Sequence, residues 1–420
     1  MHIIVIGAGV VGISTAYYLV RAGHRVSLIE RHPEPAREAS FANGGQLSYR
    51  YVAPLAAPDV PAKLPGWLLA ADAPLRFRLR ADPAQWRWGL AFLAACTARQ
   101  SARTTAQLLA LAESSRQQMT GLLAAHPGLD FAHRSNGKLV VHRDRGSFAA
   151  ARRQVELQQR LGAAGSPQEI LDAAACAARE PMLAGIAGQL AGGVFTAGEA
   201  VADCHRFCQQ LLALIREIAP DTACHFATTA QRLLTRQGRF VAVATGNGEI
   251  AADACVLASG SEAPRLAAGL GIALPIQPLK GYSLTLPLAA TDTAPSASVT
   301  DFARKIVYAP IGGQLRVAGI ADLVGNDRRI DRRRIALLRR QAAEFFPAAA
   351  DPDAGQPWSG LRPATPDGRP IIGASPCRNL WLNCGHGPLG FTLALASGKL
   401  LGELVDRQQP SIPDAAFALR

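Results

Sequence analysis

The stretch HIIVIGAGVVG, His2–Gly12, decides the fold. Its apolar beginning has the length of a buried strand, and Gly7, Gly9 and Gly12 follow at once in the pattern G-x-G-x-x-G. A helical period and a second apolar run at 25–30 complete a βαβ unit within thirty residues. In such a unit the first glycine turns the chain, the second lets the backbone approach a pyrophosphate, and the third lets helix pack on strand. The stretch therefore predicts a dinucleotide-binding, Rossmann-like fold.

Glu30 ends the second predicted strand, where a carboxylate can accept both hydroxyls of an adenosine ribose. We include its neighbour Arg31, and Val10 and Val11 within the glycine turn, in the predicted cofactor site. FAD and NAD share this adenosine half, so the stretch leaves both cofactors open.

A second glycine-rich turn, NCGHGPLGFT at 383–392, addresses that choice. A helix that begins near Pro388 offers free backbone N–H groups and a positive dipole end, which together favour an anion. Reduced flavin carries negative charge near N1 and the C2 carbonyl, so two helix N-termini suit the two ends of one extended FAD. The alternative is a helix capped by glycine for structural reasons alone. The cofactor-binding residues predicted in this turn are Gly385, Gly387, Pro388, Leu389 and Gly390.

Two further loops offer small or short polar residues to a cofactor. SFANGGQ at 40–46 follows Glu30 at a distance that lets the loop return over the cofactor, although a plain polar turn explains it equally well. Gly260, in LASGSEA, ends another predicted strand where backbone can meet the pyrophosphate or the ribityl chain. The residues predicted to contact the cofactor from the first loop are Ser40, Asn43, Gly44, Gly45 and Gln46.

The order of the predicted elements divides the 420 residues into two domains. The predicted class is α/β: a Rossmann-like FAD-binding domain of the glutathione-reductase type, with a substrate domain of antiparallel β-sheet and helices. We assign 1–53, 190–270 and 355–413 to the FAD-binding domain, 54–189 and 271–354 to the substrate and cap domain, and 414–420 to a C-terminal tail.

The net charge of +12 favours anionic partners, such as a phosphate-bearing cofactor, a carboxylate substrate or an acidic membrane surface. No nucleic-acid-binding motif accompanies it, so we expect no nucleic-acid partner. The eight cysteines lack metal-site spacing, and Cys204 and Cys208 are expected to be buried small side chains rather than ligands. We expect no metal and a cytoplasmic protein. Tryptophans beside arginines at 67–96 suit a bilayer interface, with packing within the cap as the favoured alternative.

Across residues 1 to about 413 the chain resembles the small-subunit type of bacterial D-amino-acid dehydrogenase, in the FAD-dependent superfamily of D-amino-acid oxidase, glycine oxidase and sarcosine oxidase. The blocks that carry the resemblance, in the family's order, are GAGVVG, SFANGGQ, APLAAPDVP, ADC, PLKGYSLT, GLRPATPDGRPIIG and NLWLNCGHGPLGFT. It implies FAD-dependent oxidative deamination of D-amino acids to 2-oxo acids and ammonia, by hydride transfer from the α-carbon to flavin N5. It also implies that electrons pass to a quinone or another respiratory acceptor. The stretch 67–96 would suit a peripheral position on the inner face of the cytoplasmic membrane.

The resemblance assigns to Arg362, in GLRP, the role of binding the substrate carboxylate, which suits a guanidinium that presents two parallel donors. A structural ion pair is the alternative. Tyr308 matches a place where the oxidases put a tyrosine hydroxyl on the same carboxylate, with a core tyrosine as the alternative. Tyr51 is expected to line the substrate pocket, alone or with Tyr49 and Arg50, unless that loop is merely surface.

The predicted catalytic set is completed by one histidine of the second glycine-rich turn. His386 can hydrogen-bond the flavin ring, and Lys280 can lie near it, but either can be structural. Pro388 and Phe391 stand where the dehydrogenases typically have threonine and tryptophan, which puts the preferred substrate in doubt.

Three alternatives stay open at this point. Within the superfamily, glycine, sarcosine or D-hydroxyproline oxidation is the nearest competitor. A nicotinamide-dependent dehydrogenase accounts for the first βαβ unit but not for the C-terminal blocks. A noncatalytic flavin-binding or membrane-docking module predicts that Arg362 has no functional role.

Overall fold

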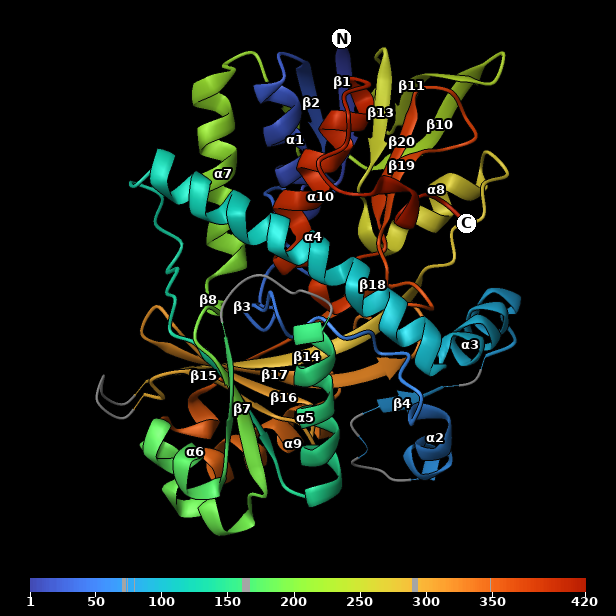
Figure 1. Cartoon of the computed structure of the whole chain (residues 1–420). Helices are drawn as coiled ribbons and strands as arrows, with labels where there is room; N and C mark the ends of the chain where they lie inside the picture. Colours follow the sequence, from blue (N-terminus) through green and yellow to red (C-terminus); the bar gives the residue numbers. More distant parts are fainter. Residues whose placement is uncertain (70–72, 74, 79, 161–166, 289–293, 348) are drawn as a thin grey trace.

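The computed structural model describes residues 1–69, 73, 75–78, 80–160, 167–288, 294–347 and 349–420. Within these residues the two largest sheets, one of six strands and one of nine, lie at opposite ends of the molecule (Figure 1). The chain crosses between the two ends several times, so each is assembled from separate segments of sequence.

The six-stranded sheet has the order β19-β20-β13-β1-β2-β9. Its strands pair in parallel except for β19, which runs antiparallel to β20. The bounds are β1 His2–Ile6, β2 Arg25–Ile29, β9 Ala223–His225, β13 Ala254–Leu257, β19 Ile371–Ala374 and β20 Leu380–Cys384. The predicted βαβ unit is thus confirmed as the centre of this sheet.

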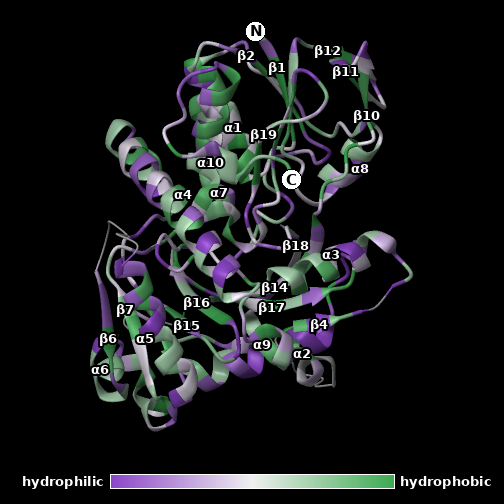
Figure 2. Ribbon diagram, turned by 45° about the vertical axis from the view of Figure 1, so that its right-hand side comes forward, coloured by the Kyte–Doolittle hydropathy of each residue, from purple (hydrophilic) through white to green (hydrophobic). Residues whose placement is uncertain are grey.

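Both faces of β1 are buried, which explains its uninterrupted apolar sequence. Ile3 and Val5 pack against helices on one face, and Ile4 and Ile6 pack on the other against a small sheet and a short helix. In Figure 2 the helices α1 and α10 beside β1 are mostly in the green and white of apolar residues. The first face is covered by α1 Val10–Arg21, α4 Ala98–Ala125, α7 Cys204–Ile218 and α10 Gly390–Val405, and the second by β10 Ala230–Arg236, β11 Arg239–Thr245, β12 Gly248–Ala251 and α8 Ala263–Ala268.

The nine-stranded sheet, mostly antiparallel, has the order β18-β14-β17-β16-β15-β5-β7-β6, with β4 also paired to β17. One face packs against α9 (Arg332–Phe345) and the region around α6 (Ala173–Arg179). The other face turns toward the six-stranded sheet (Figure 1). The strand bounds are β4 Leu75–Phe77, β5 Lys138–His142, β6 Gln168–Leu171, β7 Gly192–Thr196, β14 Gln277–Pro287, β15 Ser298–Asp301, β16 Ile306–Ile311, β17 Gln314–Leu323 and β18 Gln356–Ala364.

The remaining elements lie between or beside the sheets. A two-stranded ladder pairs β3 (Gln46–Leu47) with β8 (Ala200–Val201) and leads the chain from one sheet toward the other. The helices at the flanks are α2 Val60–Leu69, α3 Pro83–Ala95 and α5 Arg145–Arg160.

Three segments do not follow the predicted domain ranges. β7 and β18 were placed with the FAD-binding domain, yet their ladder hydrogen bonds join them to β5 and β14 of the nine-stranded sheet. α4 was placed with the cap, yet Leu108 and Leu111 pack in the core shared by α1 and α10. Strand pairing and helix packing with residues far away in the sequence decide which sheet or core these segments join. Local sequence patterns do not show such contacts. The rest of the domain division stays a prediction.

Among the described residues, one helical segment, Gly387–Val405, is long and apolar enough to cross a membrane by length and composition. It contains α10, and 67% of it is buried inside the protein, as expected for a core helix.

Candidate functional site

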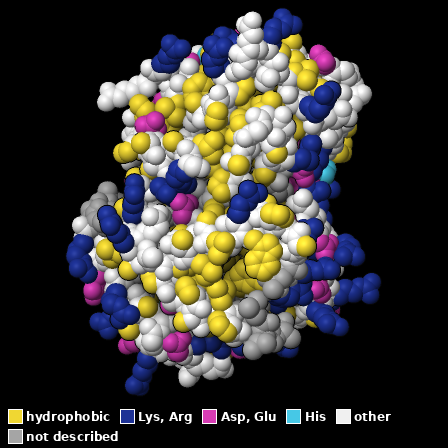
Figure 3. Space-filling view, turned by 90° about the vertical axis from the view of Figure 1, so that its right-hand side faces the viewer, with side chains coloured by type: hydrophobic (Ala, Val, Ile, Leu, Met, Phe, Trp, Pro, Cys, Tyr) yellow, Lys and Arg dark blue, Asp and Glu magenta, His cyan; other side chains and the backbone are white. Residues whose placement is uncertain are grey.

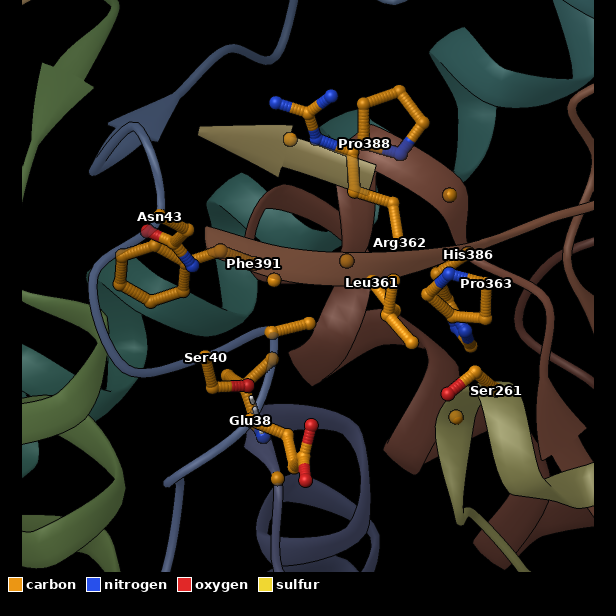
Figure 4. A pocket seen from close by; sticks show the side chains of 18 of the residues that line it. Glu38, Ser40, Asn43, Ser261, Leu361, Arg362, Pro363, His386, Pro388 and Phe391 are labelled. Carbon is orange, nitrogen blue, oxygen red and sulfur yellow. Dashed lines mark hydrogen bonds between the residues drawn. The ribbon is translucent and has the colours of Figure 1, made fainter. Parts of the chain in front are cut away.

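A cavity of about 500 Å³ lies between the two sheets, within the size range of cofactor and small-molecule sites. The turn after β1, the loop 40–46, the turn after β13, the end of β18 and the start of α10 all contribute to its wall. Figure 4 shows Ser40 and Glu38 at one end of the view and Arg362 and Pro388 at the other. The fold therefore brings glycine turns that are far apart in the sequence to the wall of one cavity.

The first glycine turn has the close packing that the sequence predicts. Gly7 has φ +103°, and a Cβ at Gly12 would lie 1.8 Å from the Gly7 carbonyl oxygen. Gly12 itself does not line the cavity, because its role is to let α1 approach β1. Gly9 does line it, and a Cβ there would meet nothing nearer than Ser40 Oγ at 3.4 Å. The space in front of Gly9 is therefore cavity, at the N-terminus of α1.

Two hydroxyl groups stand beside this helix end. Ser40 Oγ accepts a hydrogen bond from the Val10 N–H at 3.1 Å, which holds the loop against α1. Ser259 Oγ is buried at the cavity wall with no partner among the described residues, although buried polar groups are normally paired. Gly260, at φ +56°, lines the cavity next to it. The unpaired hydroxyl and the open helix end fit a polar ligand such as a pyrophosphate.

Glu30 and Arg31 both line the cavity. The Glu30 carboxylate is oriented by two backbone donors, the Ala8 N–H at 2.9 Å and the His32 N–H at 3.0 Å. Each of its oxygens keeps acceptor capacity for a hydroxyl donor from the cavity. Arg31 forms ion pairs with Glu38 and Glu262.

The loop 40–46 is held in place by hydrogen bonds and by close packing, which a plain polar turn does not require. Asn43 Oδ1 accepts from the Gly45 N–H at 3.0 Å, and Arg316 Nη1 donates to the Asn43 carbonyl oxygen at 2.8 Å. Gly45 has φ +61°, and a Cβ there would lie 2.1 Å from Ile311 Cδ1. Asn43, Gly44, Gly45 and Gln46 all line the cavity together with Ser40.

The second helix end differs in detail from the prediction. A 3₁₀ turn, Gly387–Leu389, includes Pro388, and the regular helix α10 begins at Gly390. Neither segment has a side-chain cap on its first turn, and residues 385–392 all line the cavity. The Leu389 N–H donates to the His386 carbonyl oxygen at 3.1 Å, and among the described residues no side chain caps the other N–H groups of this end. An end without a side-chain cap suits a ligand that accepts hydrogen bonds.

Arg362 projects into the cavity from β18. Its guanidinium lies directly over Gly281, where a Cβ would be 2.3 Å from Nη2, and Nη1 donates to the Ile320 carbonyl oxygen at 3.0 Å. Among the described residues no carboxylate pairs with it. Desolvation lowers the pKa of Arg362 to about 10, so it stays protonated at neutral pH. The arrangement rules out the structural ion pair and leaves a cation facing the cavity.

The prediction for Tyr308 is wrong. The side chain is fully buried, stacks on Phe345 with ring centroids 4.8 Å apart, and donates its hydroxyl to the Gln341 carbonyl oxygen at 3.2 Å. Successive residues of a strand face opposite sides of a sheet, so Val307 lines the cavity and Tyr308 faces α9. The same alternation turns Lys280 away from the cavity, where its ammonium donates to the Arg329 carbonyl oxygen.

His386 and Tyr51 both line the cavity, with different surroundings. His386 is 2% exposed, its Nε2 lies 2.8 Å from Ser397 Oγ in the interior, and burial lowers its pKa to about 3. It is therefore a neutral imidazole engaged with the protein, which fits the structural reading of this residue. Tyr51 is 36% exposed, whereas Tyr49 is buried in the core and does not line the cavity.

Sequence reasoning missed Lys138, which lines the cavity from β5. It is only 3% exposed, and its ammonium donates to Gln46 Oε1 at 2.8 Å and to Ser48 Oγ at 2.9 Å. The single signal in the sequence is a lysine at the head of an otherwise apolar strand, KLVVH, where burial of a cation is costly unless it is hydrogen-bonded.

The family description "FAD dependent oxidoreductase" (DAO) matches residues 2–404. The chain belongs to this family. Because the match includes the C-terminal glycine-rich turn as well as the first βαβ unit, it covers the blocks that a nicotinamide enzyme leaves unexplained. The glycine-rich turns near the two ends of this DAO chain, which both line the cavity, therefore lie within the matched residues.

Named relatives of this DAO chain are similar over its whole length. It is 50% identical to "D-amino acid dehydrogenase 2" of Ralstonia nicotianae, covering 100% of both chains, and 49% identical to "D-amino acid dehydrogenase 2" of Pseudomonas aeruginosa, covering 98% of this chain and 96% of the relative. Among solved structures, glycine oxidase from Geobacillus kaustophilus superimposes with a TM-score of 0.78 at 22% identity, over 100% of this chain and 98% of that one. L-proline dehydrogenase from P. horikoshii gives a TM-score of 0.77 at 17% identity, over 100% and 96%. These structures confirm the predicted fold of the DAO family.

Proposed function

We propose that this protein is an FAD-dependent dehydrogenase that oxidatively deaminates D-amino acids. The observation that carries the proposal is Arg362, a cavity-facing cation with no carboxylate partner among the described residues. The two relatives of about half identity, both named for this activity, support the choice of substrate class.

FAD fits the residues present. The open N-terminus of α1, the unpaired hydroxyl of Ser259 and the oriented carboxylate of Glu30 suit the pyrophosphate and ribose of an adenosine diphosphate. The uncapped start of α10 suits the negative charge of a reduced flavin ring. When bound, FAD supplies a two-electron acceptor for the α-hydrogen, and hydrolysis of the resulting imino acid gives a 2-oxo acid and ammonia.

Arg362 fixes the substrate by its carboxylate. Among the described residues, the guanidinium over Gly281 makes one hydrogen bond, to the Ile320 carbonyl oxygen, so it keeps further donors for a ligand in the cavity that it lines. A carboxylate held by two parallel N–H donors is restricted in position and orientation, which aligns its α-carbon for reaction. Loss of the α-hydrogen is assisted by the lone pair of a neutral substrate amine, and His386, bonded to Ser397, is not required as a base.

Anaerobic mixing of purified holoenzyme with D-amino acids, L-amino acids, glycine, sarcosine and D-hydroxyproline tests the proposal. Bleaching of flavin absorbance by D-amino acids, faster than by the other amines, is the expected result. Bleaching only by glycine, sarcosine or D-hydroxyproline would replace the substrate assignment with the nearest alternative in the superfamily. A protein that binds FAD but responds to no amine would instead support the noncatalytic alternative.

We also propose that the electrons pass to a membrane quinone or another respiratory acceptor, with α3 docking on an anionic lipid surface. α3 exposes Trp86, Leu90 and Leu93 on one side, with Arg87 exposed between them. Figure 3, which faces this side of the molecule, shows hydrophobic side chains gathered in the lower half beside Lys and Arg side chains. Apolar and aromatic anchors next to arginines are typical of interfacial helices. The opposite face of α3 is packed, since Trp88 donates to the Ala364 carbonyl oxygen at 2.8 Å.

Cosedimentation with vesicles tests this surface. Binding to vesicles that contain anionic phosphatidylglycerol, lost in the Trp86→Ser/Leu90→Ser double variant and weakened by salt, is the expected result. Ile218 and Ile330, which are also exposed but lie elsewhere, provide the matched control when both are changed to serine. Equal binding of the two double variants would show that α3 is not the docking face.

A further inference from the structure

Two buried, oppositely charged residues that the proposed chemistry does not use lie at the cavity wall and behind it. Lys138 is 3% exposed and Glu199 is 1% exposed. Lys138 lines the cavity, whereas Glu199 lies behind it and does not. Among the described residues the two groups form no salt bridge within 4.0 Å, so they act on each other through space.

The ammonium of Lys138 is fixed from three directions. It donates to Gln46 Oε1 and Ser48 Oγ, and it lies 4.1 Å from the centroid of the Tyr51 ring in a cation–π contact. Gln46, Ser48 and Tyr51 all line the cavity. The cation is therefore held at the wall by the same segment that continues from the predicted cofactor loop.

Hydrogen bonds also connect this cation to the start of α10. The Ser48 N–H donates to Thr392 Oγ1 at 3.0 Å, and Thr392 Oγ1 lies 3.5 Å from the Gln46 carbonyl oxygen. Thr392 stands in the first turn of α10 and lines the cavity. Lys138 and the positive end of α10 thus lie at the same end of the cavity.

Glu199 accepts from the Arg50 N–H at 2.7 Å through one oxygen, while its other oxygen is buried with no partner among the described residues. Burial raises the pKa of Glu199 and lowers the pKa of Lys138, and each charge opposes the shift of the other. Lys138 keeps its two hydrogen bonds and the Tyr51 ring when Glu199 is removed, and Glu199 keeps the Arg50 N–H when Lys138 is removed, so single variants are reasonable experiments.

We infer that Lys138 and Glu199 form an oriented charge pair that stabilises negative charge on the reduced flavin from the α10 end of the cavity. The positive member faces the cavity and the negative member lies behind it, so the field of the pair adds to that of the helix end. This inference rests on the proposed binding of FAD. It adds a residue, Lys138, that shifts the equilibrium of the bound flavin toward its reduced form.

The test is the equilibrium ratio of reduced to oxidised flavin in the holoenzyme, measured at pH 7.5 and a fixed solution potential against a reference dye, without substrate. Both groups are mainly charged at this pH, because the pKa of Glu199 is raised to about 7 and that of Lys138 is lowered to about 8. In Lys138→Met this ratio should fall about tenfold, the size expected of one unit charge acting over about 10 Å at an effective dielectric constant of about 20. Glu199→Gln should raise the ratio, and Lys138→Arg should stay near the parent protein. Opposite signs from the two members of the pair are not produced by general loosening of the fold.

Lys280→Met is the matched control, because Lys280 is equally buried, at 2% exposure, but points away from the cavity to the Arg329 carbonyl oxygen. The inference is overturned if Lys138→Met leaves the ratio of reduced to oxidised flavin unchanged, or shifts it no more than Lys280→Met does. If Lys138→Met does not retain FAD, Glu199→Gln decides the question, and no rise in its ratio overturns the inference. A parent protein that fails to bind FAD refutes the proposed cofactor site instead.

Discussion

At the scale of single residues, a comparison of variants at Arg362 and Tyr308 distinguishes binding of the substrate carboxylate from packing in the core. Arg362→Met removes the cavity-facing cation and a hydrogen bond to Ile320, and the cost of leaving a carboxylate without its charged partner is about 2–5 kcal/mol. We therefore expect kcat/KM for D-amino acids to fall by about 30- to 5,000-fold with flavin still bound. Tyr308→Phe, which removes a hydroxyl bonded to Gln341 inside the core, should change kcat/KM less than threefold. Steady-state kinetics on both variants checks the pair, and a matching loss in Tyr308→Phe would contradict the structure.

His386 makes a prediction about acid stability. Its pKa is about 3 in the folded protein and near 6.5 when unfolded, so below pH 6.5 the unfolded state binds more protons. The contribution of the neutral imidazole is fully present above pH 6.5 and is lost as the pH falls toward 3, at about 1.4 kcal/mol per pH unit. Against His386→Asn, the parent protein should lose its advantage in unfolding free energy between pH 7 and pH 5. Urea unfolding of both proteins at the two pH values measures this, and a constant difference would mean that the histidine keeps its ordinary pKa in the folded protein.

At the scale of elements, alanine substitutions at two glycines of the first turn should impair different properties: the stability of the apoprotein at Gly12, and FAD binding at Gly9. Gly12→Ala puts a Cβ 1.8 Å from the Gly7 carbonyl oxygen, so α1 must move from β1 and the apoprotein itself should unfold at a lower temperature. Gly9→Ala meets only Ser40 Oγ at 3.4 Å, so the apoprotein should keep its melting temperature while FAD binding weakens at least tenfold. Thermal unfolding without FAD, followed by FAD titration, distinguishes them. Normal FAD affinity in Gly9→Ala would show that the pyrophosphate does not lie at this helix end.

At the scale of the whole molecule, the cavity is lined by both large sheets, so its ligand should stabilise them together. A ligand that binds only the folded state adds about 2.7 kcal/mol at a hundredfold excess over its Kd. FAD should therefore raise the melting temperature of apoprotein in one cooperative transition. Calorimetry at increasing FAD concentration checks this, and two transitions of which FAD moves only one would show that the sheets unfold independently.

How much of this protein is readable from its sequence depends on the range of the interactions involved. The βαβ unit, the glycine turns and the cofactor-loop residues are local patterns, because steric demands at Gly7 and Gly12 and apolar runs such as that of β1 are set by near neighbours in the chain. The predicted residues at these turns, apart from Gly12, do line one cavity. The role expected of Arg362 came from a resemblance, and only the fold shows that no carboxylate of the described residues pairs with it.

Tertiary structure alone decided the rest. Tyr308 and Val307 are adjacent in sequence, and only the position of β16 in its sheet shows that Val307, not Tyr308, faces the cavity. Likewise, Lys138 and Lys280 look alike as lysines in apolar strands, and only packing against Ser48 or Arg329 gives them different surroundings. The sequence by itself determined a dinucleotide-binding chain with two helix ends for an extended cofactor. Which side chains meet between the sheets depends on strand pairing between distant segments, whose register no local pattern encodes.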